Sequence, residues 1–392
     1  MNQRRESSAQ FFLGTHLGAL VVLLSLHAAV AASPQVQTPW QLIPPSGRDP
    51  IGTVTLHLID RLRWDPIAPT HRRRQLMVQL WYPASPARAA GGAQYMEAGV
   101  AHVLDRDLST PPGTFEAVRT LARVGAAVAS APRPFPVVVY SPGNGSWRNA
   151  STALVEELVS HGFIVVTIDH PYDGEAVEFP DGTIALAQPL RQPNPALSNP
   201  LAQWDASVEP RLIVRVADVR FVLDALAAIN AGRNPDAEHR PLPAHLAGAL
   251  DLSRTGMFGH SLGAATTIEV MREDQRVRVG FMMDGPVPRV ARNTRFDRPI
   301  ILVRSDNAAI GELVGPSWRY FAPGLRGWHR AVLIAGSNHN DFTDLGLVAR
   351  HLRLSPALRT SLLLGTIDAR RVVALQRSYL TVFFNLQLCA RR

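Results

Sequence analysis

The sequence predicts an α/β fold in which a mostly parallel sheet is covered by helices on both faces. Short, almost continuously apolar runs recur along the chain, as expected for parallel strands that are buried on both sides. Segments with apolar residues at helical spacing separate several of these runs, and such alternation is typical of a parallel sheet. The length of 392 residues and the 46% share of apolar residues suit one large folded domain or two small ones.

Seven segments have the strand pattern. In chain order they are 74–82, 135–141, 162–169, 254–259, 277–284, 298–305 and 330–336. A helix is predicted over 210–229, because its apolar residues form one stripe at helical spacing. A shorter helix is predicted over 151–161, where Gly162 follows in a position that commonly ends a helix.

The chain begins with the features of a secretory signal peptide. Arg4 and Arg5 precede an apolar run over 11–32 that contains the small-x-small sequence AVA near its end. Polar residues interrupt the run, which makes it short for a membrane span of about 20 apolar residues. We therefore expect residues 1–31 to be removed on export to the periplasm or the medium, with an uncleaved N-terminal membrane anchor as the alternative.

The remainder is predicted to be a Pro-rich tether over 32–50 followed by a single domain over 51–392. Two segments interrupt the alternation of strands and helices in that domain. Residues 91–132 insert a mixed helical stretch, and 188–210 form a loop with five prolines. Either segment could cover a site at the carboxyl edge of the sheet or decorate the surface, and whether 188–210 acts as a lid stays open.

Composition narrows the class of partner. The net charge is +8, and all 40 basic residues are arginine, but they are scattered and not interleaved with aromatic residues. We therefore expect no nucleic-acid partner. Contact with anionic substrates or a peripheral membrane surface stays open. The single cysteine, Cys389, allows no internal disulfide, and the sequence does not indicate the oligomeric state.

The segment MFGHSLGAA, residues 257–265, contains the pattern G-x-S-x-G between an apolar strand and a helix start rich in small residues. That setting is the strand–turn–helix of a nucleophile elbow. Such a turn holds Ser261 at positive φ with its hydroxyl above the sheet, and it needs small residues such as Gly259 and Gly263 on either side. The backbone N–H of Leu262 is then expected to point at a developing oxyanion.

A serine hydroxyl needs a base to become a nucleophile. His339 is the candidate, because it follows the last apolar strand in AGSNHNDFTD, where a loop can bring it over Ser261. The chain order Ser, Asp, His is also the order that recurs with a nucleophile elbow. His260 adjoins the serine but is expected to point away from it, and His170 precedes the elbow.

Two carboxylates end apolar strands between the serine and the histidine. Asp284 lies in FMMDG and Asp306 in RSDNA, and either could orient the imidazole and stabilise its cation. In the commonest version of this fold the acid follows the penultimate strand, which favours Asp306. The pattern alone leaves both residues as candidates.

Several motifs together resemble the secreted platelet-activating factor acetylhydrolase family, especially its bacterial esterase members. They are RWDP, LWYPA, YSPGNG, GFIVVTIDHPYD, GHSLG, FMMDG and SNHNDFTD, and the similarity runs in this order from about residue 50 to YLTVFFNLQL at 379–388. The resemblance implies an α/β-hydrolase fold. It also implies that Asp284 is the acid, rather than Asp306, and that His339 is the base.

The same resemblance places a second oxyanion donor in the loop after the strand VVVYS. The family loop usually reads S-H-G-apolar-G, and this chain has SPGNG over 141–145, so the backbone N–H of Asn144 takes the donor position. The proline and asparagine depart from the family pattern and alter the neighbouring pocket surface.

The resulting expectation is an exported serine esterase that acts through a Ser-His-Asp triad and an acyl-enzyme. The resemblance points to short-chain or oxidised acyl esters, including sn-2 acetyl phospholipids. No metal or organic cofactor is expected, and His170 and Asp173 lack partners at metal-ligand spacing. Peptidases, thioesterases and acyltransferases use the same triad, and a non-catalytic envelope binding protein on this fold is a further alternative.

Overall fold

The computed structural model describes residues 39–86, 92–192, 196–197 and 199–389. The predicted signal peptide over 1–31 and the first part of the predicted tether lie outside these ranges. Within them, no helix is both long and apolar enough to cross a membrane.

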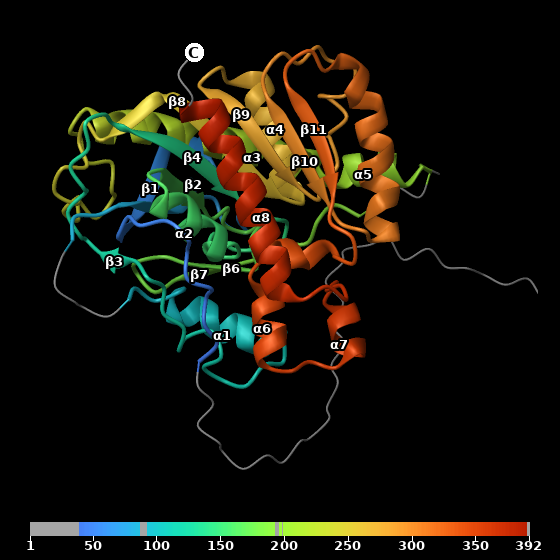
Figure 1. Ribbon diagram of the computed structural model, residues 1–392, viewed down its shortest axis with the longest axis horizontal. Coiled ribbons are helices and arrows are strands. Elements are labelled where there is room, and N and C mark those ends of the chain that lie inside the picture. The colour runs from blue at the N-terminus through green and yellow to red at the C-terminus, as the bar shows by residue number, and fades with distance from the viewer. Residues whose placement is uncertain (1–38, 87–91, 193–195, 198, 390–392) are drawn as a thin grey trace, which may run out of the picture.

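In this described part of the chain, nine strands form one sheet in the order β11-β10-β9-β8-β4-β5-β2-β1-β3 (Figure 1). The strands are β1 (Ile51–Trp64), β2 (Arg73–Pro83), β3 (Arg123–Val124), β4 (Phe135–Ser141), β5 (Ile164–Ile168), β8 (Leu250–His260), β9 (Val277–Met283), β10 (Ile300–Arg304) and β11 (His329–Leu333). The strands from β11 to β5 are parallel, whereas β2 is antiparallel to both β5 and β1. The predicted mostly parallel α/β sheet is therefore confirmed.

Helices cover both faces of the sheet, as Figure 1 shows. On one face lie α2 (Thr152–Ser160) and α8 (Ala369–Phe384), and on the other lie α3 (Pro200–Asn230), α4 (Leu262–Glu273) and α5 (Ala308–Phe321). Alternation along β4 supplies both cores: Val137 and Val139 pack toward α3 and α4, whereas Val138 and Tyr140 pack toward α2 and α8. This arrangement explains the continuous apolar runs of the inner strands.

The remaining elements are short and lie mostly at the carboxyl end of the sheet. They are α1 (Ala98–Asp107), α6 (Leu345–His351), α7 (Pro356–Ser361), the hairpin β6 (Ala176–Glu178) and β7 (Ile184–Leu186), the 3₁₀ turns η1 (Ala322–Gly324) and η2 (His339–Phe342), and the π turn η3 (Asn385–Cys389).

The strand β1 was not among the predicted strands. Its sequence, IGTVTLHLIDRLRW, alternates polar and apolar residues instead of forming an apolar run. It lies near the edge of the sheet, between β2 and the two-residue strand β3, so it does not need apolar residues on both faces. The continuous-run pattern therefore identifies the interior strands and misses this one.

The predicted loop over 188–210 is wrong in its second half, because α3 already begins at Pro200. The side chain of Asn199 accepts hydrogen bonds from the amides of Leu201 and Ala202 and so caps the helix. A proline in the first helical turn needs no hydrogen-bond partner for an N–H. Pro210 lies inside the same long helix, so neither proline marks a loop.

The described end of the Pro-rich segment packs onto the domain. Trp40 is 2% exposed, and its ring lies 5.0 Å from that of Tyr95 in an edge-on contact. Arg377 of α8 donates to the backbone carbonyls of Ile43 (2.6 Å) and Pro44 (2.8 Å). Trp40 and Tyr95 belong to a separate small core that also includes residues of α1 and α6.

Candidate active site

Ser261 lies at the junction of β8 and α4, with φ 56° and ψ −119°. Its backbone N–H donates to the carbonyl of Met283 at 2.9 Å. A Cβ on Gly259 would lie 2.2 Å from the carbonyl oxygen of Gly263, and a Cβ on Gly263 would lie 2.0 Å from that of Ser141. The close approach of strand and helix therefore requires both glycines of the GHSLG motif, and the serine has the positive φ expected of a nucleophile elbow.

The structure brings Ser261, His339 and Asp284 together from three loops at the carboxyl ends of β8, β11 and β9. The Oγ of Ser261 lies 3.0 Å from Nε2 of His339. On the other side of the ring, Nδ1 of His339 lies 2.7 Å from Oδ2 of Asp284. Ser261 is partly exposed and the His339 side chain is 12% exposed, whereas the Asp284 side chain is 1% exposed. The serine thus faces solvent and the acid lies behind the imidazole.

The carboxylate of Asp284 is stabilised in its charged form. Burial alone would raise its pKa, but the hydrogen bond to His339, the charge of that ring and the amide of Ser305 together outweigh burial and hold the pKa below its usual range. The Ser305 N–H donates to Oδ1 at 2.7 Å, which leaves Oδ2 for the imidazole. An acid at the tip of an apolar strand is therefore paired on both oxygens.

Asp306, the alternative acid, is not in contact with the imidazole in this structure. Its side chain is exposed, and its Oδ2 accepts a hydrogen bond from the N–H of Gly336 at 3.3 Å. Its own N–H donates to the carbonyl of Ser337. These bonds join the loops after β10 and β11, so the role of Asp306 in this structure is to connect the two loops.

The turn that carries His339 is fixed by side chains of the SNHNDFTD motif. The Oδ1 of Asn338 accepts the N–H of His339 at 2.7 Å at the start of η2. One oxygen of Asp341 accepts the amides of Asn338 (2.8 Å) and Gly365 (2.7 Å). The imidazole therefore projects from a turn whose backbone is held on both sides.

Asp344 ties this turn to the helix α2. Its N–H donates to the carbonyl of Ala150 at 2.6 Å, and its carboxyl accepts the N–H of Ala153 at 3.3 Å and the hydroxyl of Tyr95 at 3.1 Å. Complete burial raises the pKa of Asp344 to about 8. This carboxyl is therefore largely protonated at neutral pH.

His260, expected to point away from the site, lies against it. Its ring centroid is 4.5 Å from that of His339, and its Nε2 lies 2.9 Å from the backbone carbonyl of His339. Because a carbonyl only accepts, Nε2 carries the proton. Burial, and then the neighbouring His339, lower the pKa of His260 to about 3, so the ring is neutral. The sequence pattern gives no signal for this contact, since it depends on the fold of the distant His339 turn.

The two expected oxyanion donors belong to segments that adjoin the serine. Leu262 is the first residue of α4, and the first amides of a helix have no partner within the helix. Asn144 is exposed, in the loop that follows β4. The preceding residue, Gly143, is so near the elbow that a Cβ on it would lie 3.3 Å from the Cβ of Ser261.

A family model described as platelet-activating factor acetylhydrolase, isoform II, matches residues 71–377. The chain belongs to this family. A solved ferulic acid esterase from Streptomyces cinnamoneus is 32% identical to it, with a TM-score of 0.72, over 90% of this chain and 94% of that one. That likeness agrees with the α/β-hydrolase architecture that the family resemblance implied.

Two curated relatives of the family are more distant in sequence. A protein of Arthroderma benhamiae named "Probable 1-alkyl-2-acetylglycerophosphocholine esterase" is 25% identical over 64% of this chain and 60% of its own length. The platelet-activating factor acetylhydrolase of Cavia porcellus is 24% identical over 62% of this chain and 57% of its own length. The matched region thus spans less than two thirds of these relatives.

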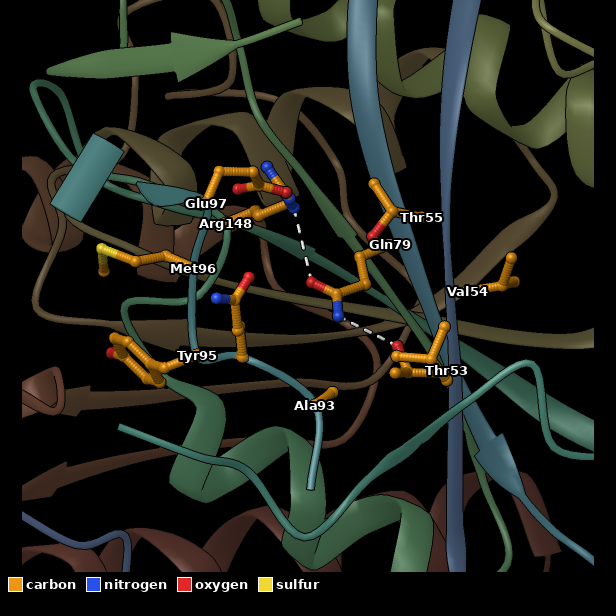
Figure 2. Close-up of a pocket in the computed structure, with 11 residues that line it drawn as sticks. Thr53, Val54, Thr55, Gln79, Ala93, Tyr95, Met96, Glu97 and Arg148 are labelled. Atoms are coloured by element: carbon orange, nitrogen blue, oxygen red, sulfur yellow. Dashed lines mark hydrogen bonds and ion pairs between the residues drawn. The ribbon is translucent and has the colours of Figure 1, made fainter. Parts of the chain in front are cut away.

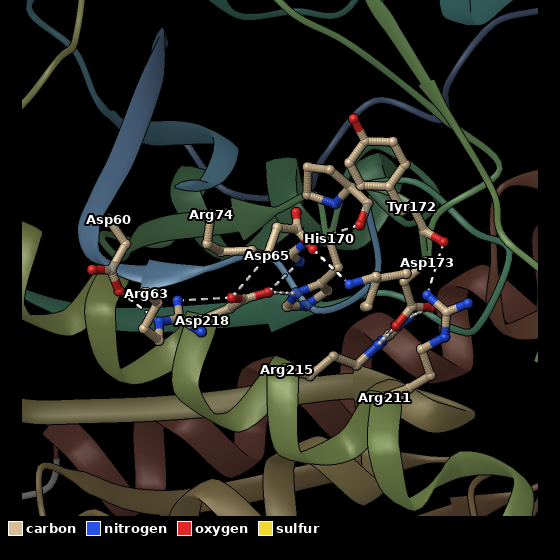
Figure 3. Close-up of polar contacts among 12 residues, drawn as sticks. Asp60, Arg63, Asp65, Arg74, His170, Tyr172, Asp173, Arg211, Arg215 and Asp218 are labelled. Atoms are coloured by element: carbon tan, nitrogen blue, oxygen red, sulfur yellow. Dashed lines mark hydrogen bonds and ion pairs between the residues drawn. The ribbon is translucent and has the colours of Figure 1, made fainter. Parts of the chain in front are cut away.

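A second Ser–His–Asp array lies in the interior of this family member. Nε2 of His170 lies 3.0 Å from Oγ of Ser141, and Nδ1 lies 2.9 Å from Oδ2 of Asp218. Asp218 is also paired with Arg74 at 2.6 Å and Arg63 at 2.9 Å, as Figure 3 shows for the charged groups. The serine and aspartate are 0% exposed and the histidine 1%, so no substrate can reach this array.

A cavity of about 150 Å³ lies beside β1 and β2, and Figure 2 shows residues that line it. Arg148, Gln79 and Thr53 line it and are joined by hydrogen bonds of 3.4 Å and 2.9 Å. Arg148 is ion-paired with Asp169 and Glu97, so its charge is already neutralised. None of the candidate catalytic residues lines this cavity, which therefore lies apart from the site.

The described residues contain no group of three or more His, Cys, Asp or Glu side chains arranged to hold a metal ion. His170 and Asp173, considered from the sequence, are instead bound to Asp218 and Arg215.

Proposed function

We propose that this chain is a serine carboxylic ester hydrolase whose catalytic residues are Ser261, His339 and Asp284. The observation that carries the proposal is the hydrogen-bonded series from Ser261 Oγ through His339 to Asp284, at 3.0 Å and 2.7 Å, on a positive-φ elbow. Membership of the platelet-activating factor acetylhydrolase family supports the same chemistry.

In the first step Ser261 Oγ attacks the ester carbonyl carbon while its proton moves to Nε2 of His339. The resulting imidazolium donates its Nδ1–H to Asp284, whose carboxylate stabilises the positive charge. As the tetrahedral intermediate collapses, the proton on Nε2 passes to the leaving alcohol and an acyl-enzyme remains. Water then repeats the sequence with the same base and releases the acid.

The negative charge on the carbonyl oxygen is assigned to two backbone donors, the N–H groups of Leu262 and Asn144. A donor of this kind is worth about 10²- to 10³-fold in kcat, because it is fixed before the charge forms. Only the backbone of Asn144 is needed, so the departure from the family loop sequence does not remove the donor.

The proposed substrates are short-chain or oxidised acyl esters, including sn-2 acetyl phospholipids. The name of one curated relative refers to a 2-acetylglycerophosphocholine ester, and the name of another refers to removal of acetyl groups from platelet-activating factor. The name of the solved relative at 32% identity favours a second candidate, esters of ferulic acid, which carry a flat aromatic acyl group.

The test is a series of p-nitrophenyl esters from acetate to palmitate, with an sn-2 acetyl phospholipid and methyl ferulate, on chain lacking residues 1–31. Rates that peak at two to four carbons and vanish in Ser261→Ala support the short-acyl proposal. Faster turnover of methyl ferulate than of the acetyl phospholipid would move the substrate class to aromatic acyl esters.

A fluorophosphonate probe detects a reactive Ser261 even when none of the tested esters is a substrate. Labelling of the wild type but not of Ser261→Ala, with no ester turned over, would redirect the search to peptides, thioesters or acyl transfer. Folded wild type that neither labels nor hydrolyses would contradict the enzyme proposal and favour a binding protein.

Export with removal of residues 1–31 is part of the proposal, and it rests on the basic and apolar residues at the start of the sequence. The mass of the protein recovered from the producing cell checks it. A mature chain that begins at Ala32 supports export with cleavage, whereas a chain that keeps residues 1–31 supports an anchor.

A further inference from the structure

One buried arginine binds the loop after β4 that carries the proposed second oxyanion donor, Asn144. Arg215 projects from α3, and its side chain is 0% exposed. Its Nη2 donates to the carbonyl of Gly143 at 2.9 Å, and its Nη1 donates to the carbonyl of Pro142. A single guanidinium thus holds two successive carbonyls of the loop.

The guanidinium is itself fixed by Asp173, as Figure 3 shows. Its Nε and Nη2 donate to the two carboxylate oxygens at 2.7 Å and 2.8 Å, and the carboxylate is also 0% exposed. The backbone carbonyl of Asp173 accepts the N–H of Gly145 at 3.0 Å. The loop is therefore held at Pro142, Gly143 and Gly145 by one buried ion pair and its backbone.

The direction of these bonds decides where the next amide points. In a planar trans peptide the C=O of one residue and the N–H of the next point in opposite directions. Because the Gly143 carbonyl points inward to Arg215, the N–H of Asn144 points outward. A Cβ on Gly143 would lie 3.3 Å from the Cβ of Ser261, so the Asn144 N–H projects from a loop that lies beside the proposed nucleophile.

We propose that Arg215, clamped by Asp173, is the positioning residue of the oxyanion hole, acting through the Gly143–Asn144 peptide. The inference rests on the proposed ester hydrolase function and adds a residue that the G-x-S-x-G and histidine motifs do not contain. An ion pair in this position is not needed for packing alone, since apolar residues of similar volume often stabilise a core as well.

Two variants test the role without leaving a buried charge unpaired. Arg215→Lys keeps the charge but loses the planar fork that reaches both carbonyls. The double variant Arg215→Met with Asp173→Leu removes both charges together. In each we expect kcat to fall by about 10²-fold with KM within threefold, because only the transition state carries the negative charge.

Arg211→Met is the matched control. Arg211 lies one turn earlier on α3 and also donates to backbone carbonyls, but to those of Tyr172, Gln188 and Pro189. We expect it to leave kcat within threefold of the wild type. Thermal unfolding of all variants shows which are folded at the assay temperature.

A boronic acid that forms a tetrahedral adduct with Ser261 gives a second measurement. Its affinity should fall in parallel with kcat in the two Arg215 variants and stay unchanged in Arg211→Met. Folded Arg215 variants with kcat and boronate affinity within threefold of the wild type would overturn the inference. A rise in KM at unchanged kcat would overturn it as well, since the arginine would then act on substrate binding.

The wild-type boronate adduct tests the geometry without any variant. Its crystal structure should place Asn144 N about 2.7–3.1 Å from the boronate oxygen, with the Gly143 carbonyl still on Arg215. A Gly143 carbonyl that has left Arg215 in the adduct contradicts the inference. Wild type that hydrolyses no ester would overturn the proposed function and this inference together, and the wild-type rate distinguishes that case from an inactive variant.

Discussion

The array at the elbow and the array in the interior contain the same residue types at almost the same distances. Serine to histidine is 3.0 Å in both, and histidine to aspartate is 2.7 Å for His339 and 2.9 Å for His170. Ser261 stands on a positive-φ turn and is partly exposed, whereas Ser141 is the last residue of β4 and is fully buried. Access and backbone conformation, rather than the three residue types, distinguish the proposed nucleophile Ser261 from the buried hydroxyl of Ser141.

The charges around the two arrays differ as well. Asp284 binds His339 and one backbone amide, so its charge acts mainly on the imidazole. Asp218 also pairs with arginines, chiefly Arg74; burial would raise its pKa, but these partners outweigh burial and hold the pKa far below its usual range. Burial, and then the charge of Arg215, lower the pKa of His170. His170 is thus a neutral link between Ser141 and the ion pairs of Asp218.

Replacing each of the two serines by alanine should give the largest difference in kcat between the two arrays. Ser261→Ala should lower kcat by roughly 10⁴-fold or more, because the acyl-enzyme cannot form. Ser141→Ala removes a buried hydroxyl and should leave kcat within about tenfold while lowering the midpoint of unfolding. Ester hydrolysis and thermal unfolding of both variants measure this. Equal losses of kcat in the two folded variants would contradict the distinction.

Replacing each candidate acid by asparagine decides which of the two, Asp284 or Asp306, orients His339. Asp284→Asn should lower kcat by about 10⁴-fold, since the amide favours the wrong tautomer of His339. Asp306→Asn, its control, should stay within threefold. Steady-state kinetics with a p-nitrophenyl ester checks both. A larger loss for Asp306→Asn would assign the acid role to that residue instead.

Removal of an arginine from the interior network should affect stability rather than chemistry. Arg74→Met leaves the buried Asp65 without its cation and Asp218 with Arg63 alone, and we expect the free energy of unfolding to fall by about 3–5 kcal/mol. The exposed ion pair of Arg295 and Asp297 provides the control. Arg295→Met should change the free energy of unfolding by less than about 1 kcal/mol. Denaturant titration measures both. Lost activity at unchanged stability in Arg74→Met would contradict the structural role.

The last prediction concerns the support of the His339 turn. Folded Asp344 keeps its proton up to about pH 8, whereas an unfolded aspartate loses it near pH 4. Between these values the folded state binds more protons, so the free energy of unfolding falls as pH rises. Asp344→Asn removes this term and should show a shallower fall from pH 5 to pH 8 in denaturant titrations. Identical slopes for the two proteins would contradict the raised pKa.

The sequence determined the interior strands, the elbow and the two loops that carry the proposed acid and base. These features are local, because a strand buried on both faces must be apolar and the elbow requires glycines two residues before and after the serine. The alternating edge strand β1 and the helical prolines of α3 lacked such local signals. In β1 every second residue is polar over much of its length, so the strand has no continuous apolar run. The start of α3 depends on Asn199 as a helix cap, and asparagine is equally common in loops.

The tertiary structure decided which side chains meet. Asp284 and Asp306 follow neighbouring parallel strands whose ends lie at the same edge, so the pattern left both open. The contact between His339 and Asp284 depends on the loop conformation after each strand, as does the position of His260. Arg215 reaches the carbonyl of Gly143 from a helix, across 72 residues of sequence. Such contacts follow from how the helices pack on the sheet, which no short segment of sequence encodes.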